Sequence, residues 1–179
     1  MIYTNFDNRK QNIIYKTMAE EGGYVDNLNI IDQPTNSGIT QPTLNKYNAD
    51  HPHFNFPHNV KDLTSEQAQQ IYGEVYYDKR RIGEIKNERI ARAVFDMGVM
   101  SNFNNVGKIV QKTLNDLIGA NLKPDGKIGD KTIKALNNIP NDKVNNFMQD
   151  LKINRIKYLQ GLPGWNKYGR GWTNRTNRY

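Results

Sequence analysis

The sequence predicts a mainly α-helical protein with one minor β-hairpin. Apolar residues recur at helical spacing in six separate segments, as expected for helices that each bury one face. Residues that favour helix starts precede several of these segments, and glycines end others. The alternation typical of strands is confined to short pieces. A length of 179 residues suits one compact domain or two small ones that share a core.

The first predicted helix begins at Asn5 or Asn8 and ends at Glu20 or Glu21. Asparagine is a favourable N-cap, and the apolar residues between these ends have helical spacing. The Gly22-Gly23 pair ends the helix, because glycine readily takes the left-handed conformation that closes one.

The segment from Tyr24 to about Asp62 is predicted to be mostly irregular, because it is rich in Asn, Pro and Asp and shows few helical periods. Within it, Tyr24-Val25 and the stretch 37–40 are candidates for a short hairpin. Irregular stretches of this length inside a compact protein usually carry function.

A second helix is predicted from the capping box formed by Thr64 and Gln67. Tyr72 and Tyr76 are four residues apart and are expected on its buried face. Tyr77 is expected off that face and exposed, where its ring can stack on a sugar.

Four more helices complete the prediction. One spans about 87–100, and the next runs from Asn104 or Asn105 to Gly119. Asp130 and Asp142 are candidate N-caps of the last two. Composition predicts a turn over 123–126, and the glycine- and aromatic-rich stretch from 161 onward is assigned no helix.

Composition excludes several classes of protein. Cysteine is absent, which rules out disulfides, a catalytic thiol and Cys-ligated metal sites. Mean hydropathy is −0.83, and no stretch approaches the roughly 20 apolar residues that span a bilayer, so no membrane insertion is expected. No basic start followed by an apolar run is visible at the N-terminus, so we expect a chain made in the cytoplasm without a signal peptide.

The charge is unevenly distributed. Residues 1–100 carry 11 Lys and Arg against 13 Asp and Glu, whereas residues 101–179 carry 14 against 5. A basic second half is attracted to a polyanion, and charge alone does not choose between nucleic acid and a bacterial cell wall.

The adjacent carboxylates Glu20 and Glu21 stand where the first predicted helix opens into the long loop. A carboxylate at a helix C-terminus faces the negative end of the helix dipole, which disfavours its ionised form. Desolvation in a cleft would raise its pKa further, as a general acid for a glycosidic oxygen requires. The alternative interpretation is a solvated helix end without a catalytic role.

Several motifs in the first half resemble glycoside hydrolase family 108, whose members are lysozyme-like proteins that cleave peptidoglycan. The first two motifs are Glu-Gly-Gly-Tyr-Val at 21–25 and Thr-Asn-Ser-Gly-Ile-Thr at 35–40. The others, in order, are Leu63-Thr64, Ala68, Ile71-Tyr72, Tyr76-Tyr77 and Phe95-Asp96. The resemblance implies a lysozyme-like helical fold with a small hairpin or loop region near the active site.

The second half resembles the peptidoglycan-binding module that accompanies this family. The matching motifs are Asp-Gly-Lys-Ile-Gly at 125–129, Lys131-Thr132 and the terminal stretch 168–175. The resemblance implies a catalytic domain over 1–100 and a helical peptidoglycan-binding module over 101–179 that packs on it.

The resemblance also implies roles for individual residues. Glu21 takes the position of the catalytic glutamate, the general acid for the bond between N-acetylmuramic acid and N-acetylglucosamine, and Thr35 is a candidate for holding the attacking water. The family's usual aspartate position holds Ile30, so Asp32 or Asp26 is the candidate for the second polar group that glycosidases need, with Asp32 preferred because it is nearer Thr35. The predicted substrate-binding residues are Tyr24, Gly38, Ile39, Thr40, Tyr77, Ser101 and Asn102.

Three other functions stay open. The Ile30 departure favours a non-catalytic wall-binding or virion structural protein, and a lytic transglycosylase would use the same glutamate. The basic half is compatible with a nucleic-acid binder, but its charges are scattered and no nucleic-acid motif is present. We therefore predict peptidoglycan as the partner, no nucleic acid, and a monomer.

No metal or cofactor is predicted. His51, His53 and His58 lie in a loop-like stretch where the flanking prolines stiffen the chain, and His-x-His alone is a weak ligand signal.

Without a visible signal, such an enzyme needs a holin-type or dedicated release route to reach the wall in the periplasm or outside the cell. A phage endolysin fits this expectation best, followed by a secretion-associated muramidase.

Overall fold

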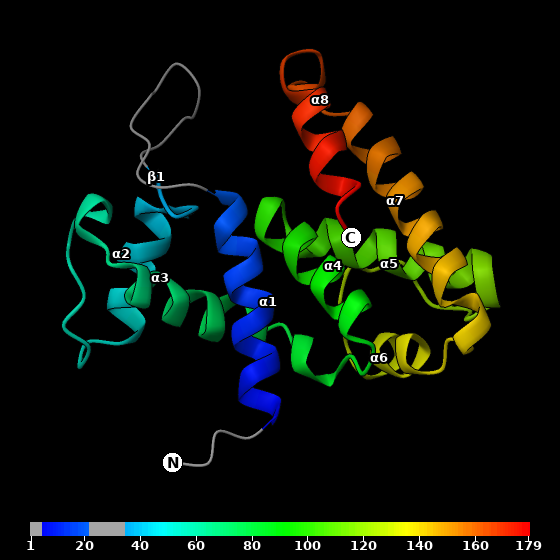
Figure 1. Cartoon of the computed structure of the whole chain (residues 1–179), viewed down its shortest axis with the longest axis horizontal. Helices are drawn as coiled ribbons and strands as arrows, with labels where there is room; N and C mark the ends of the chain where they lie inside the picture. Colours follow the sequence, from blue (N-terminus) through cyan, green and yellow to red (C-terminus); the bar gives the residue numbers. More distant parts are fainter. Residues whose placement is uncertain (1–4, 22–34) are drawn as a thin grey trace. The chain divides into compact units, whose positions relative to one another are not determined.

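The computed structural model describes residues 5–21 and 35–179, with side chains for 8–19 and 35–179. The chain divides into two compact units, Met1–Lys79 and Arg80–Tyr179. The predicted fold class is confirmed, because the described residues are mainly helical with one two-stranded antiparallel sheet (Figure 1). The division into domains after residue 100 stays a prediction.

The described residues of the first unit form three α-helices, the small hairpin, a 3-10 helix and a π-helix. Its elements are α1 (Asn5–Glu21), β1 (Thr35–Asn36), β2 (Ile39–Thr40), α2 (Gln41–Asp50), η1 (Val60–Asp62), α3 (Ser65–Ile71) and η2 (Tyr72–Asp78). The predicted first helix is confirmed, and its Ile13, Ile14 and Thr17 form a buried stripe. This stripe faces α3 and η2, which α1 contacts.

A small hairpin is present, but its strands are Thr35–Asn36 and Ile39–Thr40, so Ser37 and Gly38 of the predicted stretch form its turn. Both residues have positive φ, 51° and 77°, which gives a two-residue loop whose twist matches that of the strands. Thr35 pairs with Thr40 and Asn36 with Ile39. The other predicted hairpin piece, Tyr24-Val25, lies outside the described residues.

Side-chain hydrogen bonds tie the hairpin turn to the rest of the unit. The Tyr72 hydroxyl donates to the Ser37 carbonyl at 2.8 Å, and the Asn36 amide donates to the Leu63 carbonyl at 3.0 Å. The turn therefore has a fixed position beside the start of α3.

The prediction of a mostly irregular segment up to residue 62 is wrong for α2. Thr40 caps this helix, with its hydroxyl oxygen accepting from the Thr43 amide at 3.3 Å, and Pro42 occupies the first turn, where proline is tolerated. Only Leu44 and Tyr47 of α2 are buried, so its apolar periodicity is too sparse to reveal the helix.

The expected exposure of Tyr77 is also wrong. Tyr77 is 1% exposed, whereas Tyr76 is half-buried. The reason is that the chain over Tyr72–Asp78 is a π-helix, in which hydrogen bonds join residues five apart. This wider turn brings Tyr77, rather than Tyr76, onto the face that holds Tyr72, and its buried ring is unavailable to stack on a sugar.

The second unit is built from five helices and two short 3-10 turns. Its elements are η3 (Ile82–Glu84), α4 (Glu88–Met100), α5 (Phe103–Ile118), α6 (Asp130–Asn137), η4 (Asn141–Lys143), α7 (Val144–Gln160) and α8 (Trp165–Thr176). Helix α5 contacts α4, α6 and α7, and α8 packs on α7 (Figure 1). The unit is thus organised around α5, whose buried residues include Val106, Val110 and Leu114.

Helix α8 was not predicted. Glycine disfavours helix interiors, and α8 contains Gly169 and Gly171. Gly169 is required by packing, because a Cβ there would lie 2.7 Å from the Trp165 ring. The candidate caps Asp130 and Asp142 are corrected too, since Gly129 and Lys143 occupy the N-cap positions of α6 and α7.

Gly107→Ala is expected to destabilise the second unit by about 1–3 kcal/mol, the usual range for overpacking. Gly107 lies within α5, and a Cβ there would overlap the backbone carbonyl of Gly126. The matched control is Gly171→Ala within α8, where a Cβ meets nothing within 4 Å and alanine favours the helix by roughly 1 kcal/mol. Urea unfolding of both variants measures the difference, and equal effects would contradict the close approach.

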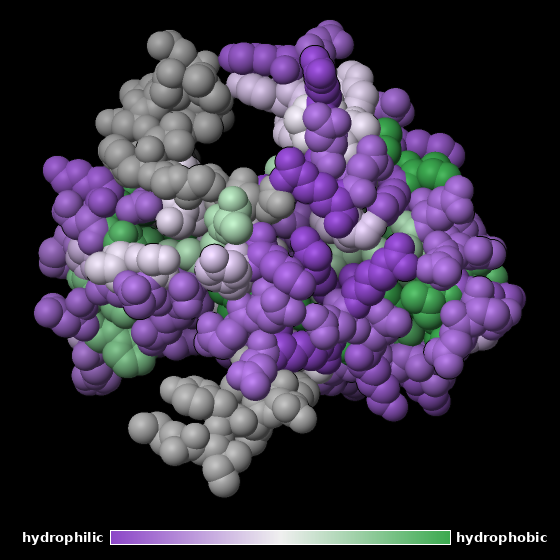
Figure 2. All heavy atoms as spheres, in the orientation of Figure 1, coloured by the Kyte–Doolittle hydropathy of each residue, from purple (hydrophilic) through white to green (hydrophobic). Residues whose placement is uncertain are grey.

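Hydrophilic residues cover most of the face shown in Figure 2, and apolar residues form small separate groups on it. Among the described residues, no helix has the length and apolar character needed to cross a membrane.

Candidate functional site

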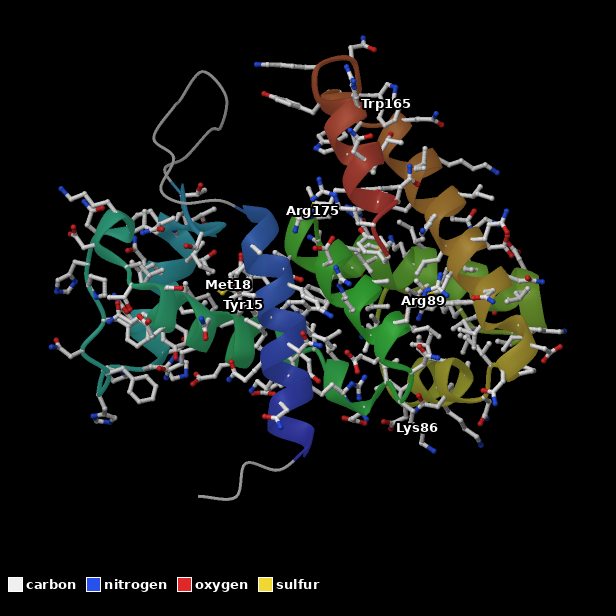
Figure 3. The ribbon with its side chains drawn as sticks, in the orientation of Figure 1. Tyr15, Met18, Lys86, Arg89, Trp165 and Arg175 are labelled. Carbon is white, nitrogen blue, oxygen red and sulfur yellow. The ribbon has the colours of Figure 1, made fainter. Side chains whose placement is uncertain are left out.

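A cleft of about 320 Å³ lies in the first unit, between the last turns of α1, the hairpin and α3. It is lined by Tyr15, Met18, Ala19, Ser37, Ser65 and Gln69. Figure 3 labels Tyr15 and Met18 on α1. Helix α1 ends two residues after Ala19, at Glu21, so the cleft borders the helix end at which the sequence predicts the catalytic carboxylate.

The composition of the cleft suits a sugar. Tyr15 is 68% exposed and offers an aromatic ring with a polar tip. Ser37, Ser65 and Gln69 add short polar groups, and ligand sites typically combine apolar or aromatic walls with a few such groups. Tyr15 was missed by the sequence analysis, although it lies off the stripe of Ile13, Ile14 and Thr17 and is therefore an aromatic residue facing solvent.

Four predicted site residues belong to the hairpin beside this cleft. Thr35 is half-buried in β1, opposite Thr40. Gly38 provides the left-handed turn position, and Thr40 caps α2. Ile39 is 0% exposed, so its side chain belongs to the core and cannot contact a substrate.

The other predicted site residues of the first unit lie partly or wholly outside the residues that the structure describes. Glu21 is the last residue of α1, and its side chain is outside the described part. Tyr24, Asp32 and Ile30 fall in the range 22–34, also outside the described residues. Their roles stay predictions.

Ser101 and Asn102 lie at the junction of α4 and α5 in the second unit. Ser101 is the C-cap of α4, and the Asn102 side chain caps α5 by accepting from the Asn104 amide at 2.8 Å. Capping accounts for Asn102 being polar, and contact of either residue with substrate stays a prediction.

The histidines show no sign of a metal centre within the described ranges, where no group of three or more potential ligands gathers. His51 instead stacks on Tyr47 at 4.2 Å between ring centroids, and its Nε2 lies 3.5 Å from a Glu74 carboxylate oxygen.

Asp96 forms an ion pair that the sequence analysis did not anticipate. Its carboxylate accepts from Arg175 Nη2 at 2.8 Å and from Arg175 Nε at 3.2 Å, which joins α4 to α8. Both side chains are nearly buried, with 6% and 11% exposed. Burial and the adjacent Asp96 charge raise the pKa of Tyr179, and burial lowers the pKa of Arg155. Asp96 therefore pairs with a residue 79 positions away in the sequence.

The comparisons with known proteins agree with this arrangement. Residues 14–101 match the family described as Glycosyl hydrolase 108, and residues 105–177 match the one described as Predicted Peptidoglycan domain. The solved structure of Brucella abortus SagA is similar, with a TM-score of 0.77 and 29% sequence identity over 96% of this chain and 91% of that chain. No curated protein matches the chain.

Asp96 lies in the first matched segment and Arg175 in the second, so their ion pair connects the two within one compact unit. Together, the matched segments and the lysozyme-like helical fold assign the chain to the glycosyl hydrolase 108 family, as a glycoside hydrolase that acts on peptidoglycan and carries a peptidoglycan-binding domain.

Proposed function

We propose that this peptidoglycan hydrolase is an N-acetylmuramidase that cleaves the β-1,4 bond between N-acetylmuramic acid and N-acetylglucosamine, with Glu21 as general acid. The observation that supports the proposal is the cleft of about 320 Å³ at the last turn of α1, the helix that ends at Glu21. An exposed tyrosine ring and three polar side chains line this cleft, which suits a chain of amide-bearing sugars.

In this mechanism the protonated Glu21 carboxyl donates its proton to the glycosidic oxygen as the C–O bond breaks and positive charge develops on the sugar. A water molecule then attacks the sugar carbon and loses its proton to a base. We assign Thr35 to holding this water and Asp32 to activating it or stabilising the positive charge. The position of Glu21 at a helix C-terminus favours its protonated form.

A route to the wall is part of the proposal. The basic second half would concentrate the enzyme on anionic wall polymers, an attraction that salt weakens. We propose action on the wall in the periplasm or outside the cell, as a phage endolysin released with a holin or as a secretion-associated muramidase.

One observation favours a second candidate function. Ile30 stands at the position where the resembling family usually has an aspartate, and loss of the second polar group would leave a wall-binding protein without activity.

Mass spectrometry of the soluble fragments that the wild-type protein releases from purified peptidoglycan tests the proposal. Fragments with reducing N-acetylmuramic acid ends are expected. Fragments with anhydro ends would instead indicate that the enzyme cleaves the same bond by transglycosylation. If no fragments form while the protein still sediments with the wall, the enzyme proposal fails and the binding protein remains.

A further inference from the structure

We infer that a second cavity, in the unit Arg80–Tyr179, binds carboxylate groups of the peptide stems of peptidoglycan. The inference rests on peptidoglycan being the substrate of the proposed function, and it is independent of Glu21. The cavity measures about 540 Å³ and lies between α5, the start of α6 and the loop that joins them. This volume is in the range of small-ligand sites.

The loop around the cavity is held by one buried side chain, Gln111 of α5, which is 2% exposed. Its amide nitrogen lies 2.9 Å from a carboxylate oxygen of Asp125 and 3.0 Å from the Lys127 carbonyl, and its oxygen accepts from the Gly126 amide at 2.9 Å. Because these bonds fix the loop to a helix, the cavity is preformed, and a ligand need not order it.

The same contacts hold the pKa of the Asp125 carboxyl below its usual value of 3.8, chiefly through the Gln111 amide and then through the Lys127 backbone amide. A carboxyl whose pKa is lowered by folding stabilises the fold at pH values above its usual pKa. This stabilisation is lost as the pH falls through the lowered pKa.

In the wild type, the free energy of unfolding of the second unit is expected to fall as the pH is lowered from ~5 to ~2, and Asp125→Asn is expected to make this fall smaller. Urea unfolding at several pH values in this window measures the effect. Identical pH dependence in the variant and the wild type would show that the loop contacts do not perturb this carboxyl.

Three exposed lysines, Lys123, Lys127 and Lys131, line the cavity. Within the described part of the chain none of them takes part in an ion pair. The two acidic residues at the cavity are already engaged, since Asp125 accepts the bonds above and Asp130 pairs with Arg81 at 2.6 Å. The cavity therefore carries more ammonium groups than carboxylates, and one of its two carboxylates is paired with an arginine outside the lining.

An anionic ligand that also carries amides fits this lining. Ammonium groups bind carboxylates through charge-assisted hydrogen bonds, and Asn121 and the loop backbone can pair with peptide groups. The peptide stems of peptidoglycan supply both kinds of group. Because residues 105–177 match a peptidoglycan domain, we assign the cavity to the stem rather than to the phosphates of other wall polymers.

The test uses the full chain and isothermal titration calorimetry. The probe is the soluble stem tetrapeptide with free carboxylates, compared with its fully amidated form. In the test variant Lys123, Lys127 and Lys131 are changed to Gln. In the control the exposed lysines Lys108, Lys143 and Lys157, which do not line the cavity, are changed to Gln, so that net charge is matched.

The free-carboxylate peptide is expected to bind the test variant about tenfold more weakly, since three exposed charge pairs each contribute modestly, and to bind the control variant unchanged. Equal losses in both variants, no binding to the protein with its lysines intact, or tighter binding of a polyglycerol phosphate than of the peptide would each overturn the inference. The release of fragments from peptidoglycan by the variant that lacks the three cavity lysines is measured in a separate experiment. A failure of the binding inference can therefore be distinguished from a failure of the proposed hydrolysis.

Discussion

Glu21→Gln is expected to lower the release of reducing sugar ends from peptidoglycan by about 1,000-fold, because general acid catalysis contributes roughly 10²–10⁴-fold. Glutamine keeps the size of the side chain and removes the proton that the glycosidic oxygen requires. Reducing-end quantification at several enzyme concentrations measures the loss. Sedimentation of the variant with intact peptidoglycan is expected to be unchanged, because wall binding does not need the proton.

The chain offers a matched control for this experiment in Glu20→Gln. This substitution makes the same change of side chain one residue earlier in α1 and is expected to change activity by less than about threefold, because the proposed mechanism takes the proton from Glu21 alone. Equal losses in the two variants would indicate a general charge effect at the helix end. Full activity of Glu21→Gln would remove Glu21 from the mechanism.

Asp96→Asn is expected to destabilise the second unit by about 3 kcal/mol, because it leaves the nearly buried Arg175 guanidinium without a compensating charge. In a unit of this size such a loss lowers Tm by roughly 10–20 °C. Thermal unfolding followed by circular dichroism measures it. Since Asp96 and Arg175 belong to the two matched segments, the loss would show that the hydrolase and peptidoglycan-binding segments stabilise one another.

Asp116→Asn is the matched control, because Asp116 pairs with Lys112 on α5 with both side chains more than half exposed. Its effect is expected to stay below about 0.5 kcal/mol. The double variant Asp96→Asn with Arg175→Gln is expected to lose less than the sum of the single losses, since the partners act on one another. Additive losses would mean that the pair contributes no coupling energy.

Local signals in the sequence predicted much of the helical framework. The capping box of Thr64 and Gln67 is present, with Gln67 Oε1 accepting from the Thr64 amide at 3.0 Å. Asn102 and Gly119 delimit α5 near the predicted ends. These features depend on residues three or four apart, whose interactions are formed within one turn of helix.

Predictions from local sequence patterns were wrong where contacts with residues outside the pattern decide the conformation. Tyr77 is buried because the helix widens to a π-helix, and α8 keeps Gly169 because the Trp165 ring occupies the space of a side chain. Neither periodicity nor helix propensity contains such information.

The candidate site divides in the same way. The sequence alone determined that a glutamate stands at the end of the first helix and that a basic half suited to an anionic wall follows. Only the tertiary structure decided that Tyr15, Ser37 and Gln69 line one cleft, that Asp96 pairs with Arg175, and that Gln111 fixes the lysine-lined loop. The reason is physical: capping and turn geometry are fixed by adjacent residues, whereas clefts and buried ion pairs depend on which distant faces pack together.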